Sequence, residues 1–288
     1  MTNAKTRPPA NQLFKNRWHG KLVCVGLDSN YRKIPGYRPL GSQLDLQLGF
    51  NMRIVQETNS LVAAYKLNLA FYLARGEEGV KELRRTIAYI HEVDATIPVI
   101  LDAKWADIGS TNEGYVEFAF DRLNVDAVTL NPYLGFEALQ PFFDRQDKFF
   151  FVLCRTSNQG AGEFQDILDA EGRPLYQTVA RRVREHWDKA SHIGLVVGAT
   201  YPEELRQVRQ IVGNFPLLIP GIGKQGGDLQ ETLLNGVDPL DPQVLINSSR
   251  EVIFASNDPD TFAKAAGAAT LDLDKKIRAI TKQIRSSP

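Results

Sequence analysis

Two carboxylates and an ammonium group stand close together in the middle of the sequence. Asp102 and Lys104 follow the apolar run 98–101, which predicts a buried strand, and Asp107 lies in the loop just beyond. Because side chains alternate along a strand, Asp102 and Lys104 leave it on the same face. Flanking carboxylates favour the charged form of a lysine, so Lys104 is a candidate proton donor. A Schiff-base role fits less well, since it needs a neutral amine in an apolar surround. The structural alternative is an ion-pair network that caps the following helix.

The elements that position these groups are eight strand-like runs separated by amphipathic helical stretches. Such alternation predicts parallel strands joined by right-handed crossovers. Eight units in about 260 residues favour an α/β fold of the (β/α)8 TIM-barrel type, in a single domain, over a doubly wound sheet. No Gly-x-Gly-x-x-Gly motif follows the first run, which also argues against a dinucleotide fold. The predicted strands are Lys21–Asp28, Ala63–Ala70, Pro98–Lys104, Ala127–Tyr133, Phe149–Thr156, Ile193–Ala199, Pro216–Gly223 and Gln243–Arg250.

Polar residues follow every predicted strand except the sixth. In such barrels the chemistry gathers at the C-terminal ends of the strands, so these residues predict one polar-rimmed pocket. Residues 157–172 form a long connection and a candidate active-site loop. Residues 1–12 are polar and proline-bearing, which predicts a flexible N-terminal arm, and residues 13–288 are expected to form the barrel.

A glycine-rich turn, residues 221–227, is a candidate phosphate site. Its four glycines let backbone N–H groups approach an anion, and the helix expected after Asp228 adds positive potential at its start. Arg250 ends the next strand, and a guanidinium binds phosphate in bidentate fashion. Phosphate sites of barrels commonly follow strands seven and eight. The structural alternative for Arg250 is a surface ion pair with Glu251 or another acid.

Composition excludes several classes of function. Lys and Arg number 34, as do Asp and Glu, so no net charge attracts the chain to nucleic acid or membrane. Two cysteines exclude a disulfide framework, and the four histidines show no metal-ligand spacing. No signal peptide or membrane-spanning run is evident. We therefore expect a soluble, cytoplasmic protein without a metal or other cofactor.

Several of these motifs together resemble the orotidine 5′-phosphate decarboxylase family, from residue 20 to about residue 270. The resemblance lies in Asp102-x-Lys104-x-x-Asp107-Ile108-x-x-Thr111, preceded by Gly26-Leu27-Asp28 and followed by Pro220-Gly221-Ile222-Gly223-x-Gln225-Gly226-Gly227-Asp228. Ala103 and the run 153–158 are similar to the longer bacterial type of that family. Trp105-Ala106 departs from the Arg-Gly expected in that type.

The resemblance implies a carboxy-lyase that converts orotidine 5′-monophosphate to uridine 5′-monophosphate in de novo pyrimidine biosynthesis, without a cofactor. It also implies a homodimer, in which Asp107, Ile108 and Thr111 reach the neighbouring subunit's site. By the same resemblance, Lys104 would protonate pyrimidine C6, within a charge network that includes Asp102, Asp107 and Lys66.

The resemblance also implies how the nucleotide binds. Asp28 and Lys66 would bind the ribose hydroxyls, and Ser157 and Pro220 would contact the base. Gln225 and Arg250 would bind the phosphate.

Two alternatives remain at this stage. One is a Mg²⁺-dependent sugar-phosphate decarboxylase or synthase of the same barrel superfamily, whose third strand also carries Asp-x-Lys-x-x-Asp. Ile108, Thr111 and the run 225–228 favour the orotidylate enzyme over it. The other is a non-catalytic barrel that binds a phosphorylated ligand, which the intact charge network disfavours.

Overall fold

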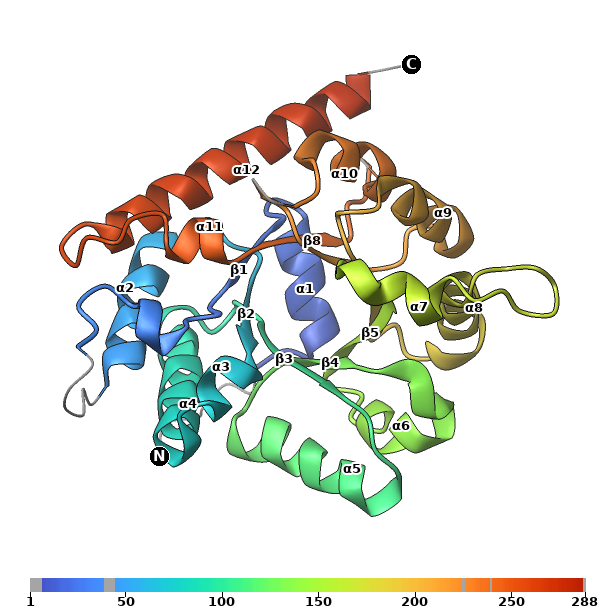
Figure 1. Ribbon diagram of the computed structural model, residues 1–288, viewed down its shortest axis with the longest axis horizontal. Coiled ribbons are helices and arrows are strands. Elements are labelled where there is room, and N and C mark those ends of the chain that lie inside the picture. Colours follow the sequence, from blue (N-terminus) through green and yellow to red (C-terminus); the bar gives the residue numbers. More distant parts are fainter. Residues whose placement is uncertain (1–6, 39–44, 224–225, 239, 287–288) are drawn as a thin grey trace.

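The computed structural model describes residues 7–38, 45–223, 226–238 and 240–286. In this part of the chain, eight parallel strands close into a barrel in sequence order, with helices around it (Figure 1). The predicted TIM barrel is confirmed. Each predicted run coincides with one strand, although the third strand extends one residue beyond its run, to Trp105. The strands are β1 (Val23–Gly26), β2 (Ala64–Asn68), β3 (Val99–Trp105), β4 (Ala127–Leu130), β5 (Phe149–Arg155), β6 (Ile193–Val197), β7 (Leu217–Pro220) and β8 (Val244–Ser248).

The helices lie mainly between successive strands, as the alternating pattern predicts. They are α1 (Ala10–Trp18), α2 (Leu46–Thr58), α3 (Leu69–Leu73), α4 (Gly76–Val93), α5 (Gly109–Val116), α6 (Gly135–Phe143), α7 (Gly162–Gln165), α8 (Leu175–Arg182), α9 (Pro202–Val212), α10 (Leu229–Gly236), α11 (Arg250–Ile253) and α12 (Phe262–Ser286). The second strand was expected to continue to Ala70. It ends at Asn68 because the Asn68 side chain accepts the Ala70 N–H at 3.1 Å and so caps α3. No helix in the described ranges is both long and apolar enough to cross a membrane.

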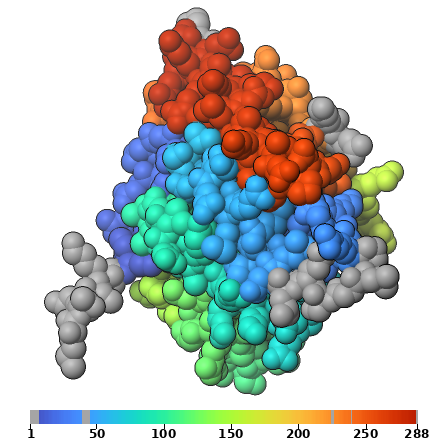
Figure 2. Space-filling model, turned by 90° about the vertical axis from the view of Figure 1, so that its left-hand side faces the viewer, coloured from blue at the N-terminus to red at the C-terminus, as the bar shows by residue number. Residues whose placement is uncertain are grey.

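The barrel closes where the first and last strands pair. β1 lies parallel to β8, with Val23 opposite Ile246. Outside this seam α2 packs against α12, and Phe50 stacks on Phe262 with 4.9 Å between ring centroids. Figure 2 shows this face, with the red C-terminal helix above the blue segments of α2. Strands covered on both sides are mostly apolar, as β1, β4 and β6 are, which explains the hydrophobic runs in the sequence.

Helix α1 covers the N-terminal end of the barrel. Its Phe14 is fully buried and lies 5.1 Å from Phe149 and 5.7 Å from Phe151, ring centroid to ring centroid, at the start of β5. The prediction of a loose arm over residues 1–12 is therefore wrong for residues 10–12, which form the first turn of this helix. The apolar residues of α1 pack against the barrel, which the polar composition of residues 1–12 did not indicate. Residues 1–6 lie outside the described part of the chain.

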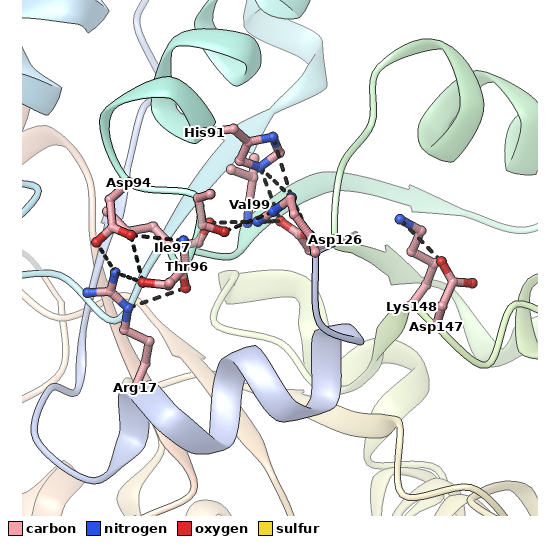
Figure 3. A network of polar contacts seen from close by, with 11 residues as sticks. Arg17, His91, Asp94, Thr96, Ile97, Val99, Asp126, Asp147 and Lys148 are labelled. Carbon is pink, nitrogen blue, oxygen red and sulfur yellow. Dashed lines mark hydrogen bonds and ion pairs between the residues drawn. The ribbon is translucent and has the colours of Figure 1, made fainter. Parts of the chain in front are cut away.

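Three charged or titratable side chains form a cluster at the same end of the barrel, which we call the basal cluster: Arg7, His91 and Asp126 (Figure 3 labels the last two). Arg7 Nη1 lies 2.8 Å from Asp126 Oδ1 and 2.9 Å from His91 Nε2. Asp126 Oδ2 also accepts the Val99 N–H at 2.8 Å, which fixes the start of β3. Burial alone would raise the pKa of Asp126, but the His91 hydrogen bond and the Arg7 charge outweigh it and hold that pKa below its ordinary value.

Candidate active site

A cavity of about 670 Å³ opens at the C-terminal ends of the strands. Its lining comes from several different strands and the loops after them, which is where barrel enzymes place their chemistry. Six residues predicted from the sequence line it: Asp28, Lys66, Asp102, Ser157, Pro220 and Arg250. The predicted polar-rimmed pocket is therefore present.

Four side chains form an alternating chain of charges at this cavity, which we call the mouth cluster: Asp28, Lys66, Asp102 and Lys104. Lys66 Nζ lies 3.4 Å from Asp28 Oδ1 and 3.1 Å from Asp102 Oδ2. Lys104 Nζ lies 2.5 Å from the other carboxylate oxygen, Asp102 Oδ1. Asp102 thus lies between two ammonium groups. The sequence had instead predicted Lys104 between two carboxylates, Asp102 and Asp107, and of these the structure pairs Lys104 with Asp102.

The pKa shifts keep the inner pair of the mouth cluster charged. Burial alone would lower the pKa of Lys66, but Asp28 and Asp102 outweigh it and the pKa is raised above its ordinary value. Burial alone would raise the pKa of Asp102, but Lys66 and Lys104 bring it well below the ordinary value. Lys66 and Asp102 therefore both stay charged across the neutral pH range.

The two lysines differ in their access to solvent. The Lys66 side chain is 4% exposed and is enclosed between its two carboxylates, whereas the Lys104 side chain is 47% exposed. Lys66 therefore serves as a fixed internal charge. Of the two lysines, Lys104 is the one that a ligand can reach. Its ammonium group bonds a carboxylate that lines the cavity, and its side chain is half exposed to solvent.

A bulge in β3 presents Lys104 to the mouth. Leu101 pairs with Val128 and Trp105 pairs with Leu130, so three residues of β3 lie opposite the single residue Thr129 of β4. Lys104 lies within this bulge and adopts φ +53°, a left-handed conformation that is unfavourable for a residue with a side chain. Bulges of this kind redirect side chains beside active sites.

Trp105, which departs from the family pattern, anchors the far end of the bulge. Its indole stacks on Tyr115 of α5, with 4.7 Å between ring centroids and 10° between ring planes. Its carbonyl accepts the Asn131 N–H at 2.9 Å, where the pairing with the end of β4 resumes. The substitution leaves Asp102 and Lys104 in place and packs the loop after β3 against α5.

Four predicted residues of the described chain do not line the cavity. Lys104 borders it only through its contact with the lining residue Asp102. The other three are Asp107, Ile108 and Thr111. They lie on the loop after β3 and the first turn of α5, where Ile108 is 64% exposed. Asp107 takes part in a local turn, in which its Oδ1 accepts the Ile108 N–H at 2.7 Å. Within one subunit these three side chains therefore form an outer edge of the mouth.

The glycine-rich turn faces the opposite side of the cavity. Gly221 has φ +95°, a conformation that glycine adopts without strain. The turn is closed by a hydrogen bond from Gly227 N–H to Gly221 O at 2.8 Å. A Cβ at Gly227 would lie 2.0 Å from the Ala199 carbonyl oxygen, so only glycine fits there. Arg250 begins α11 and lines the cavity beside this turn, whereas Gln225 lies outside the described residues.

Sequence reasoning missed some residues of the site. Thr200 follows β6 and lines the cavity, so the sixth strand also contributes a polar group, contrary to the prediction. Thr129 was missed because it lies inside β4, although a buried threonine in an apolar strand was a usable signal. Conversely, Arg155 at the end of β5 is buried and pairs with Asp166 at 3.3 Å, so it anchors the 157–172 loop.

The described residues hold no cluster of three or more His, Cys, Asp or Glu side chains arranged as metal ligands. Two of the carboxylates that line the cavity, Asp28 and Asp102, are instead engaged by lysines.

Comparison with known proteins identifies the family. A model described as "Orotidine 5′-phosphate decarboxylase / HUMPS family" matches residues 21–266. An orotidine 5′-phosphate decarboxylase of Ralstonia nicotianae is 46% identical over 257 residues, which are 89% of this chain and 93% of that protein. The structure of Leishmania donovani OMP decarboxylase matches with a TM-score of 0.81 and 36% identity, over 95% of this chain and 98% of that chain. Leishmania donovani UMP synthase matches with a TM-score of 0.82 and 38% identity, over 93% of this chain but 56% of that chain. This chain therefore belongs to the orotidine 5′-phosphate decarboxylase / HUMPS family.

Proposed function

We propose that this protein decarboxylates orotidine 5′-monophosphate to uridine 5′-monophosphate, as a step of pyrimidine biosynthesis. Its relatives are named for this reaction. The observation that carries the proposal is the mouth cluster, in which an exposed ammonium group, Lys104, is held by Asp102 at the opening of the cavity. The cluster supplies a fixed positive charge and a proton at one point. Those are the two things that this reaction needs.

The reaction breaks the bond between C6 and the carboxylate, and the electron pair stays on C6. That lone pair lies in the plane of the pyrimidine ring, so the π system cannot delocalise it. Stabilisation must therefore be electrostatic and come from a preorganised cation next to C6. The Lys104 ammonium group then transfers a proton from Nζ to C6, which forms the new C–H bond, and the neutral amine recovers a proton from water.

One lysine does not account for the whole rate enhancement. Two unit charges about 4 Å apart interact by about 4 kcal/mol at an effective dielectric constant near 20. Enzymes typically lower barriers by about 8–23 kcal/mol. The remainder is assigned to binding energy from the phosphate and ribose, which aligns the base with Lys104.

The remaining cavity residues are proposed to bind the nucleotide. Asp28 and Lys66 form an ion pair that lines the cavity, and we assign them to the ribose hydroxyls. Ser157 and Pro220 line the wall where the base would lie, and Arg250 with the glycine-rich turn would bind the phosphate. Gln225 is assigned to the phosphate by family resemblance alone.

We also propose that the active unit is a homodimer with shared sites. The positions of these residues at the edge of the mouth support this, since Ile108 and Thr111 are exposed and Asp107 is partly exposed, so a second copy could reach them. Mixing inactive Lys104→Ala and Asp107→Ala proteins should then restore activity, because a mixed dimer contains one intact site. Failure of the mixture to regain activity would count against shared sites.

The proposed location is the cytoplasm. Both cysteines, Cys24 and Cys154, are buried free thiols, and burial raises the pKa of each to about 12. Unpaired cysteines suit a reducing compartment.

The decisive experiment follows the loss of absorbance when the protein is incubated with orotidine 5′-monophosphate in metal-free buffer, with and without EDTA. We expect turnover that EDTA leaves unchanged. Activity abolished by EDTA and restored by Mg²⁺ would favour the metal-dependent alternative. Tight binding without any turnover would favour a non-catalytic binding barrel.

A further inference from the structure

The hydroxyl group of Thr129 joins the two central residues of the mouth cluster. Thr129 Oγ1 donates a hydrogen bond to Asp102 Oδ1 at 2.9 Å. The same oxygen accepts the backbone N–H of Lys104 at 3.0 Å. The side chain therefore fixes the carboxylate that holds the Lys104 ammonium group and also fixes the Lys104 backbone.

The bulge explains why a side chain is needed at this point. Because three residues of β3 lie opposite one residue of β4, the regular backbone ladder is interrupted between Leu101 and Trp105. A backbone N–H that is partly buried there needs another acceptor. Thr129 is 1% exposed and is the β4 residue opposite the bulge, so its hydroxyl takes that place.

Lys104 also needs such a restraint for conformational reasons. A left-handed backbone conformation is disfavoured for a residue with a Cβ and persists only where surrounding contacts enforce it. The Lys104 side chain is half exposed and its ammonium group contacts Asp102, so its own packing provides little of that restraint. The remaining restraint acts on the backbone, through Thr129.

We infer that Thr129 is a positioning residue, whose hydroxyl holds the β3 bulge in the conformation that places Lys104 for proton transfer. This inference deepens the proposed function and rests on it. Thr129 does not line the cavity, so it acts through Asp102 and Lys104. It should therefore control the rate of the chemical step and leave nucleotide affinity almost unchanged.

The test compares Thr129→Val, which keeps the shape and removes the hydroxyl, with Thr129→Ser, which keeps the hydroxyl. We expect kcat of Thr129→Val to fall about 10- to 100-fold, because a small misplacement of a reacting group costs about that much. KM and the affinity for uridine 5′-monophosphate should stay within about threefold of wild type. Thr129→Ser should recover kcat to within about threefold of wild type. Thr270→Val is the matched control, since Thr270 is a fully buried threonine whose hydroxyl bonds only a helix carbonyl, that of Ala266.

Two results would overturn the inference: a Thr129→Val protein with kcat within twofold of wild type, or a Thr129→Ser protein as slow as Thr129→Val. Wild-type turnover is measured first, and its absence would contradict the proposed function rather than the positioning role. In that case a crystal structure of Thr129→Val decides the positioning role. Lys104 should leave the left-handed region in the variant, and an unchanged Lys104 backbone would refute the inference.

Discussion

The two ends of the barrel each hold a carboxylate surrounded by basic groups, but the two clusters differ in what remains accessible. In the basal cluster, Asp126 is buried and bonded to Arg7, His91 and a backbone N–H. In the mouth cluster, Asp102 is similarly bonded, but one of its partners, Lys104, is half exposed beside a cavity. The comparison teaches that a buried charge network indicates chemistry only when one charged member faces a space that a ligand can enter.

Lys104→Ala is expected to produce the largest effect. It tests whether the mouth cluster, unlike the basal cluster, serves turnover rather than stability. It removes the proton source, so turnover should fall by about 10³-fold or more, while the melting temperature changes little because the side chain is half exposed. Steady-state kinetics and thermal unfolding measure the two outcomes. Lys276→Ala is the control, since Lys276 is an exposed, ion-paired lysine on α12. Near-normal release of CO2 by Lys104→Ala would place the chemistry elsewhere.

Arg250→Ala tests whether affinity and chemistry are divided within the mouth. The variant loses a charge-assisted hydrogen bond to phosphate, so uridine 5′-monophosphate should bind about 10- to 100-fold more weakly. Uridine, which lacks the phosphate, should bind as it does to wild type. Calorimetric titration of both ligands decides the matter, and equal losses for the two would make Arg250 a structural residue.

Asp126→Ala tests the opposite assignment, that the basal cluster serves stability alone. Removal of this buried carboxylate deprives Arg7 and His91 of their carboxylate partner and leaves the Val99 N–H without its acceptor. We expect a loss of about 3 kcal/mol in the free energy of unfolding. The kcat of the folded variant should stay within about twofold of wild type. Urea unfolding and steady-state kinetics measure these effects. A large fall in kcat without a loss of stability would remove the distinction between the clusters.

The smallest expected effect is a change in the pH dependence of stability. Because the pKa of Asp126 is held below its ordinary value, this carboxylate stabilises the fold above about pH 3.9, and its contribution is lost as the pH falls through the folded-state pKa. In Asp126→Asn, the free energy of unfolding should therefore fall less steeply with acidification below about pH 4. Urea unfolding at a series of pH values measures the slope. The exposed Asp272 supplies the control, and an Asp126→Asn slope equal to that of Asp272→Asn would contradict the assignment.

The barrel was predictable from the sequence because strands that are covered on both faces are continuously apolar and alternate with amphipathic helices. Helices such as α4 (Gly76–Val93) and α9 (Pro202–Val212) lie between strands, where amphipathic stretches were predicted. Helix α1 was not predicted, since its pattern is weak and its cover consists of phenylalanines far along the chain, Phe149 and Phe151.

The site was predictable as a set of residue types but not as a geometry. Strand alternation was enough to place Asp102 and Lys104 together, whereas the bulge and the left-handed Lys104 backbone depend on the pairing of β3 with β4. The role of Thr129 depends on the same pairing. Such features come from the contact between two strands, and no pattern within either strand records them.

The packing of α1 also has a consequence for how the protein is made on the ribosome. The helix is synthesised before the phenylalanines that cover Phe14, because these lie more than a hundred residues later, at the start of β5. At ordinary rates of synthesis that interval is on the order of ten seconds. Throughout it, Phe14 lacks these two aromatic partners, so this face of α1 cannot reach its native packing until β5 has been made.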